Sequence, residues 1–178
     1  MQLKLEEEEM AEEIINRVAN SKLITIDLED YYPQGKRVTL DIKQWLFHEL
    51  ILKEKDFREY LINHNWEQYK NCYVALYCSS DAIIPSWAYL LITSKLAPHT
   101  KKTVVGSLEL LETLLYTDII KELDTSNFTN KPVIIKGCAN KPIPPTAYAE
   151  LIEKIQVVAK TVMYGEACST VPLYKKKK

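Results

Sequence analysis

Three of the four cysteines in this chain stand in turn-like settings, and these thiols are the residues best suited to do chemistry. Cys78 follows the apolar run Tyr73–Tyr77 and begins the polar turn CSSD, which also contains Asp81. Cys138 ends the segment IIKGC, and Cys168 ends the segment GEAC. Thiolates are favoured ligands of zinc and iron, so the chemistry depends on whether the fold brings these cysteines together.

A metal site is the first interpretation of these residues. Three cysteines complete a tetrahedral zinc or iron site with a carboxylate, a histidine or a water molecule. Asp81 or Glu166 would supply that carboxylate or lie next to the ligands. The predicted metal residues are therefore Cys78, Cys138, Cys168, Asp81 and Glu166. Such a site fits an accessory protein in iron–sulfur cluster or metal handling.

Two other interpretations stay open. Cys78 precedes a predicted helix, whose N-terminal dipole and N–H groups favour a thiolate, so Cys78 could be a nucleophile or a persulfide carrier. No histidine lies near it in the sequence to act as its base. Alternatively, the cysteines are small buried residues, Asp81 is a turn or cap residue, and the protein is a non-catalytic interaction module.

Composition argues against several other classes of function. The net charge of -1 disfavours general nucleic-acid binding, and no apolar run approaches the roughly 18 residues of a membrane span. The acidic start of the chain is unlike a secretory signal, so we expect a cytoplasmic protein with free or metal-bound thiols. No Gly-rich loop is present, so we expect no nucleotide cofactor. The 11 tyrosines suggest an association surface and a homodimer.

Strands alternate with helices from residue 72 onward. The predicted strands are 72–77, 103–105 and 132–136, and the predicted helices are 85–96, 107–123 and 145–164, the last capped by Gly165. This alternation indicates a parallel sheet with right-handed crossovers. Ligands gather at the carboxyl ends of such strands, so Cys78, Gly106 and Cys138 should share one edge of the sheet. Cys168 would reach that edge only if residues 166–174 run back along the sheet.

The first part of the chain is predicted to pack on this unit. Apolar residues at helical spacing predict a helix over 5–20, and branched residues predict strands over 23–28 and 37–42. The turn residues 32–35 favour an antiparallel pairing of these two strands. The prediction is a single α/β domain over 1–178, in which the helix and strand pair of 1–71 pack on a helix-covered, mainly parallel βαβαβα unit over 72–178. Lys175–Lys178 form a flexible basic tail.

Three stretches carry a family resemblance: YCSSDAIIPSWAYLL, VIIKGCANKP and MYGEACSTVPLYK. Through them the chain resembles the uncharacterised bacterial domain-of-unknown-function family 2480 over nearly its whole length. The motifs fall on Cys78, Asp81, Pro85, Trp87, Gly137, Cys138, Gly165, Glu166 and Cys168. The resemblance implies no activity and no catalytic residue. Family members look like genomic companions of iron–sulfur assembly genes, which implies iron–sulfur assembly proteins as partners.

Overall fold

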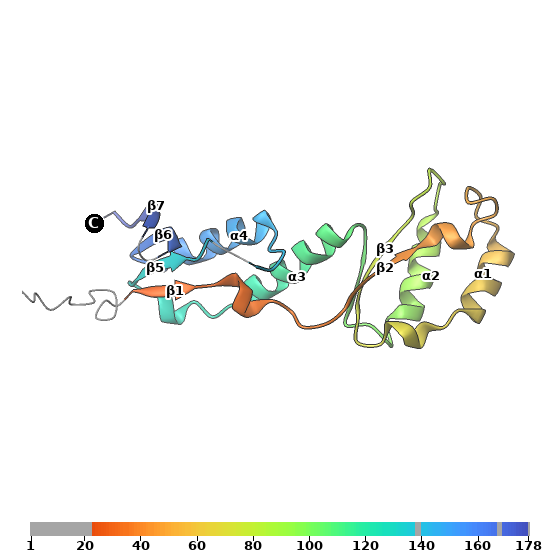
Figure 1. Ribbon diagram of the computed structural model, residues 1–178, viewed down its shortest axis with the longest axis horizontal. Helices are drawn as coiled ribbons and strands as arrows, with labels where there is room; N and C mark the ends of the chain where they lie inside the picture. Colours follow the sequence, from red (N-terminus) through yellow and green to blue (C-terminus); the bar gives the residue numbers. More distant parts are fainter. Residues whose placement is uncertain (1–22, 138–139, 167–168, 178) are drawn as a thin grey trace, which may run out of the picture. The chain divides into compact units, whose positions relative to one another are not determined.

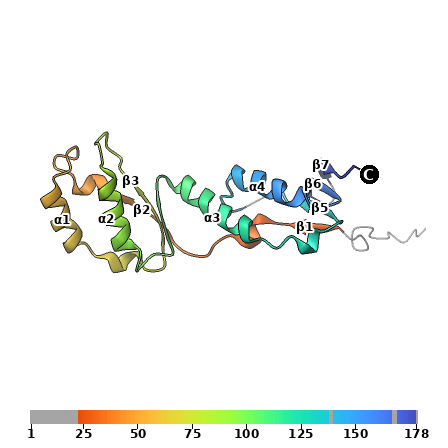
Figure 2. The same ribbon diagram turned by 180° about the vertical axis from the view of Figure 1, so that it is seen from behind.

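The computed structural model describes residues 23–137, 140–166 and 169–177, which form a mixed α/β fold with two separate sheets (Figures 1 and 2). The described chain groups into two compact units. One unit holds 27–124 and 140–154, and the other holds 23–26, 125–137, 155–166 and 169–177. The helix predicted over 5–20 lies outside the described residues, as do Cys138 and Cys168.

The first unit contains a three-stranded parallel sheet. Its strands are β2 (Arg37–Asp41), β3 (Tyr73–Tyr77) and β4 (Lys102–Val105), in the order β2-β3-β4. The helices α1 (Glu54–Asn63) and α2 (Ser86–Leu96) lie in the two connections between these strands. β3 is the central strand of this sheet, and its three middle residues are buried.

Alternation along β3 divides the core of this unit into two layers, because successive strand side chains point to opposite faces. Val74 and Leu76 pack in a cluster with the buried side chains of α1 and α2, including Phe57. Ala75 packs on the other face with Leu111 of α3 (Leu108–Glu122). The sheet is therefore covered by helices on both sides, as a parallel sheet requires.

The second unit contains a four-stranded sheet. Its strands are β1 (Ile24–Ile26), β5 (Pro132–Ile135), β6 (Thr161–Glu166) and β7 (Ser169–Lys175), in the order β1-β5-β6-β7. The pairs β1–β5 and β5–β6 are parallel, and β6–β7 is an antiparallel hairpin with an irregularity at Val162. The remaining helix, α4 (Pro145–Gln156), precedes β6 in the chain.

Most of the predicted elements are confirmed. The strands over 72–77, 103–105 and 132–136 correspond to β3, β4 and β5, and the helices over 85–96 and 107–123 correspond to α2 and α3. The two short strands predicted near the start of the chain are β1 and β2. The sequence therefore predicted the fold class and most element positions correctly.

Three predictions about pairing and length are wrong. β1 and β2 do not form an antiparallel pair, because each pairs in parallel with a later strand of a different sheet. The predicted βαβαβα unit does not form one sheet, because β5 pairs with β1 and β6 rather than with β3 or β4. The last helix ends at Gln156, so Gly165 lies within strand β6 instead of capping a helix.

Candidate functional site

Cys78 lies at the carboxyl end of the central strand β3, where the sequence placed it. Its side chain is half-buried, and its Sγ lies 3.3 Å from the hydroxyl oxygen of Ser80. The hydrogen bond and charge of Glu49 raise the pKa of Lys43, and burial raises the pKa of Tyr89. The charge of a nearby Cys78 thiolate adds a smaller contribution to the raised pKa of each group. Cys78 is thus a partly accessible thiol with a hydroxyl neighbour.

Asp41 holds the turn that carries Cys78. Its Oδ1 accepts hydrogen bonds from the backbone N–H of Ser79 at 3.1 Å and of Lys43 at 2.9 Å. Burial raises the pKa of Asp41, but its hydrogen bonds to Ser79 and Lys43 outweigh burial, so the pKa is below its ordinary value. Asp41 therefore ties the carboxyl end of β2 to the turn after β3.

The predicted metal residues are only partly within the described structure. Asp81 is exposed and lines a surface hollow with Pro85 and Trp87, and Glu166 is exposed at the end of β6. Among the described residues, no group of three or more histidine, cysteine or acidic side chains could hold a metal ion. Cys138 and Cys168 lie outside the described residues.

Cys78 and Cys138 follow strands of two different sheets, and not neighbouring strands of one sheet as the sequence predicted. Cys78 follows β3 of the three-stranded sheet, whereas Cys138 comes three residues after Ile135, the end of β5 in the four-stranded sheet. The alternation of strands and helices suggested one sheet, but alternation does not determine which strands pair. The prediction that Cys78 and Cys138 follow strands at one edge of the same sheet is therefore wrong.

The carboxyl ends of β5 and β6 lie side by side instead. These parallel neighbours pair at Ile135 and Tyr164. The Tyr164 hydroxyl donates a hydrogen bond of 3.2 Å to the carbonyl of Gly137, the residue before Cys138 in the sequence. β6 then ends at Glu166, two residues before Cys168.

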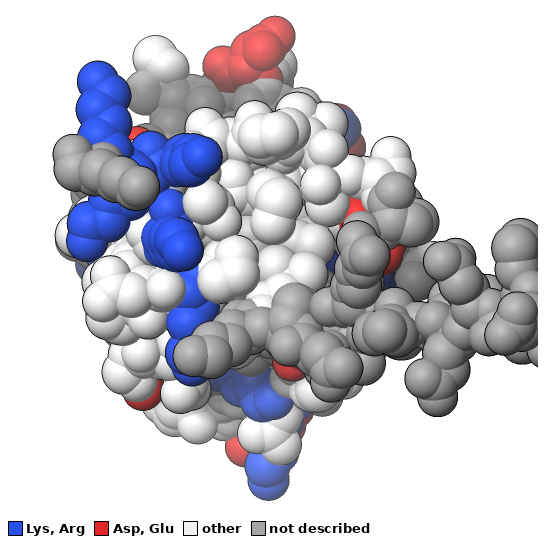
Figure 3. Space-filling model, turned by 90° about the vertical axis from the view of Figure 1, so that its left-hand side faces the viewer, with Lys and Arg blue, Asp and Glu red and all other residues white. Residues whose placement is uncertain are grey.

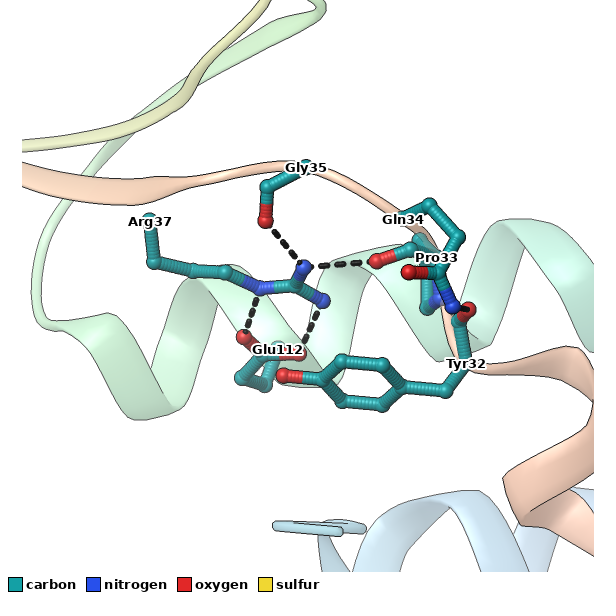
Figure 4. Close-up of polar contacts among 6 residues, drawn as sticks. All are labelled: Tyr32, Pro33, Gln34, Gly35, Arg37 and Glu112. Atoms are coloured by element: carbon teal, nitrogen blue, oxygen red, sulfur yellow. Dashed lines mark hydrogen bonds and ion pairs between the residues drawn. The ribbon is translucent and has the colours of Figure 1, made fainter.

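A buried ion pair that the sequence did not reveal joins β2 to α3 (Figure 4). Arg37 Nε and Nη2 donate to the two carboxylate oxygens of Glu112 at 2.6 and 3.2 Å. Arg37 Nη1 also donates to the carbonyls of Pro33 and Gly35. Burial lowers the pKa of Arg37, but the hydrogen bond and charge of Glu112 outweigh burial, so this pKa is above its ordinary value. No local spacing connects two residues 75 positions apart.

A mainly apolar cavity of about 720 Å³ lies beside this ion pair. Its walls are Tyr32, Arg37, the first turns of α3 and the proline-rich segment Pro142–Thr146. The Tyr32 ring stacks on the guanidinium of Arg37, with 4.3 Å between the guanidinium carbon and the ring centroid. Glu29 holds the base of the proline-rich segment by accepting hydrogen bonds from two backbone N–H groups, those of Asn140 and Lys141. The cavity is large enough for a small ligand.

Comparison with known proteins finds one family model, described as a protein of unknown function (DUF2480), that matches residues 12–176. The chain belongs to this family. The DUF2480 match includes all four cysteines and the Arg37–Glu112 pair. No curated protein and no solved structure matches the chain. Among the described residues of this DUF2480 protein, no helix is long and apolar enough to cross a membrane.

Proposed function

We propose that this DUF2480 protein is a cytoplasmic accessory protein in iron–sulfur cluster or metal handling. Its working site is a zinc or iron ion bound by Cys138 and Cys168, with Glu166 as a third ligand. Cys78 and Asp81 are left out of this ligand set, because the shared sheet edge that connected them to Cys138 does not exist. Its partners are iron–sulfur assembly proteins, as the family resemblance implies.

The parallel pairing of β5 with β6 is the observation that supports this ligand set. Because Ile135 and Tyr164 are paired, the chain leaves both strands at the same edge of the sheet. Neighbouring strands are about 4.8 Å apart, a separation that two cysteine side chains can bridge through one metal ion. The hydrogen bond from Tyr164 to Gly137 holds the end of β6 close to the segment that follows β5. Glu166, the last residue of β6, is exposed.

A site with two thiolates and one carboxylate suits transfer of a metal rather than permanent structural binding. Structural zinc sites are usually closed by four protein ligands, whereas three protein ligands leave a position open. A partner's thiolate could occupy that open position while the ion passes between the two proteins. The exposure of Glu166 agrees with access by such a partner.

Metal analysis of full-length protein purified without chelator tests the proposal. We expect about one zinc or iron ion per chain, retained in Cys72→Ser and lost in both Cys138→Ser and Cys168→Ser. Cys72 is the matched control because it is a buried cysteine in the core of the other unit. Protein that contains no stoichiometric metal, or that keeps it in Cys138→Ser and Cys168→Ser, would contradict the proposal.

A second candidate function rests on Cys78. Its half-buried thiol lies beside the Ser80 hydroxyl, in a turn that Asp41 holds in place, and this setting suits a nucleophile or a persulfide carrier. Metal-free protein whose Cys78 is alkylated much faster than a free thiol would support this function. A metal-free protein with slow Cys78 alkylation would instead favour a non-catalytic interaction module, for which the cavity beside Arg37 is the binding site.

A further inference from the structure

Five lysines gather at one edge of the four-stranded sheet, the edge where β5 and β6 begin and β7 ends. We call them the lysine edge: Lys131, Lys160, Lys175, Lys176 and Lys177. Backbone hydrogen bonds connect them across the strands, from Lys160 N–H to the carbonyl of Lys131 and from Lys176 N–H to the carbonyl of Lys160. Lys175, predicted to begin a flexible tail, pairs with Thr161 at the end of β7. Figure 3 shows lysine and arginine side chains gathered beside an uncharged area on this face.

Charge is unevenly distributed in this unit. Its described residues, 23–26, 125–137, 155–166 and 169–177, contain six lysines but a single acidic residue, Glu166. Glu166 lies at the opposite edge of the sheet, because β6 begins at Thr161 beside the lysines and ends at Glu166. No described acidic residue forms an ion pair with the lysine edge. The edge is therefore a concentrated positive surface on a protein whose net charge is only -1.

β1, the first described strand, begins at this same edge. β1 is parallel to β5, and Ile24 pairs with Val133, so the chain enters the sheet beside Lys131. Residues 1–13 contain six glutamates, Glu6–Glu9, Glu12 and Glu13, and one lysine. The stretch from Glu13 to Ile24 spans about 16 Å even if it is fully helical, and four neighbouring strands span about 14 Å. The glutamates can therefore reach every lysine of the edge.

We propose that the lysine edge binds an acidic peptide segment and that its occupant is the glutamate-rich segment 6–13 of the same chain. Its charge complements that of the edge, and its connection to β1 holds it there at high local concentration. Val157, which is 75% exposed and comes three residues before Lys160, offers an apolar contact for the apolar residues of the helix predicted over 5–20. An acidic segment of another protein must displace segment 6–13 before it can bind the edge.

Zero-length cross-linking of the full-length protein with a carbodiimide tests this proposal, because the reagent joins carboxylates and amines only when they touch. Lys55, Lys70 and Lys95 are the matched controls, since they are exposed lysines of the other unit. We expect cross-links from segment 6–13 to the lysine edge to exceed those to the controls by about fivefold. They should disappear in 1 M NaCl, where the Debye length is about 3 Å.

Mixing isotope-labelled with unlabelled protein identifies which chain supplies the segment. We expect cross-links only between peptides that carry the same label. Cross-links between labelled and unlabelled peptides would show that a second copy fills the edge, and they would overturn the proposal. Cross-links spread evenly over the edge and the control lysines, or unchanged in 1 M NaCl, would also overturn it.

Discussion

Arg37 and Glu112 form a bidentate ion pair that joins the first strand of the three-stranded sheet to helix α3. Their side chains are only 14% and 11% exposed. The guanidinium carbon also lies over two aromatic rings, 4.3 Å from the ring centroid of Tyr32 and 5.0 Å from that of Tyr73. The charge of Arg37 is thus balanced by Glu112, and the pair stabilises the wall of the neighbouring cavity, which also contains the carboxylate of Glu109.

Removing Glu112 should destabilise the protein strongly. Glu112→Leu leaves Arg37 largely buried without its counter-charge, and we expect a loss of about 3–5 kcal/mol in the free energy of unfolding. Urea denaturation followed by circular dichroism measures this change. Glu54→Leu is the matched control, because Glu54 forms an exposed pair with Arg58, and its effect should stay within about 0.5 kcal/mol. Equal effects of the two substitutions would show that burial does not strengthen the Arg37–Glu112 pair.

Stability should fall as the pH drops below about 6.5 because of His64. Burial lowers the pKa of His64 from its ordinary value of 6.5, and its Nε2 lies 3.0 Å from the Tyr69 hydroxyl. The folded state therefore binds a proton less readily than the unfolded state. The resulting stabilisation is complete above the unfolded pKa and is lost as the pH falls through the folded pKa.

The His64→Gln variant should show a weaker decline of stability between pH 6.5 and pH 5 than the wild type. The ring of His64 contacts Trp45 and Trp66, so tryptophan fluorescence during urea unfolding at each pH follows this region directly. An identical pH dependence in the two proteins would remove His64 as the source of the decline.

The start of helix α3 depends on Ser107. Its hydroxyl oxygen accepts a hydrogen bond of 3.2 Å from the backbone N–H of Leu110. Ser107→Ala should therefore lower the free energy of unfolding by about 1 kcal/mol. Ser94→Ala is the control, because Ser94 lies near the end of α2 and donates to the carbonyl of Leu91 instead of capping a helix start. We expect that substitution to change stability by no more than about 0.5 kcal/mol in thermal denaturation.

The hairpin of β6 and β7 requires a glycine at position 165. Gly165 has a φ of +122°, and a Cβ atom there would lie 2.5 Å from the carbonyl oxygen of Ser169. Gly165→Ala should cost about 1–3 kcal/mol and weaken metal binding by the proposed site, because the strand leading to Glu166 must shift. Ser169→Ala, an exposed position in the same hairpin, should change neither stability nor metal content. Both properties unchanged in Gly165→Ala would contradict this role.

Local patterns predicted the elements well, and long-range pairing is where the predictions failed. The apolar residues of α4 continue at helical spacing to Val162, so the helix was expected to run through a stretch that forms β6. Thr161, Met163 and Tyr164 suit a strand equally well, and pairing with β5 on one side and β7 on the other decides the outcome. A short apolar run is compatible with both a helix and a strand, and tertiary contacts decide which of the two forms.

For the candidate site too, local features were predicted correctly and long-range contacts were not. The position of Cys78 directly after a strand followed from local sequence and is confirmed. The partner of each strand depends on contacts between residues far apart in the chain, so the sequence placed Cys78 and Cys138 on the same sheet edge incorrectly. The Arg37–Glu112 pair could not be predicted for the same reason, because its two residues are 75 positions apart in the chain.

Site-resolved alkylation is the most direct test of the proposed metal site. Full-length protein with and without one equivalent of zinc is treated with iodoacetamide, and mass spectrometry measures the modification of each cysteine. We predict that zinc protects Cys138 and Cys168 while Cys78 reacts at the same rate in both samples, with buried Cys72 slow throughout. Protection of Cys78, or equal reaction of Cys138 and Cys168 with and without zinc, would contradict the proposal that the β5–β6 edge holds the metal.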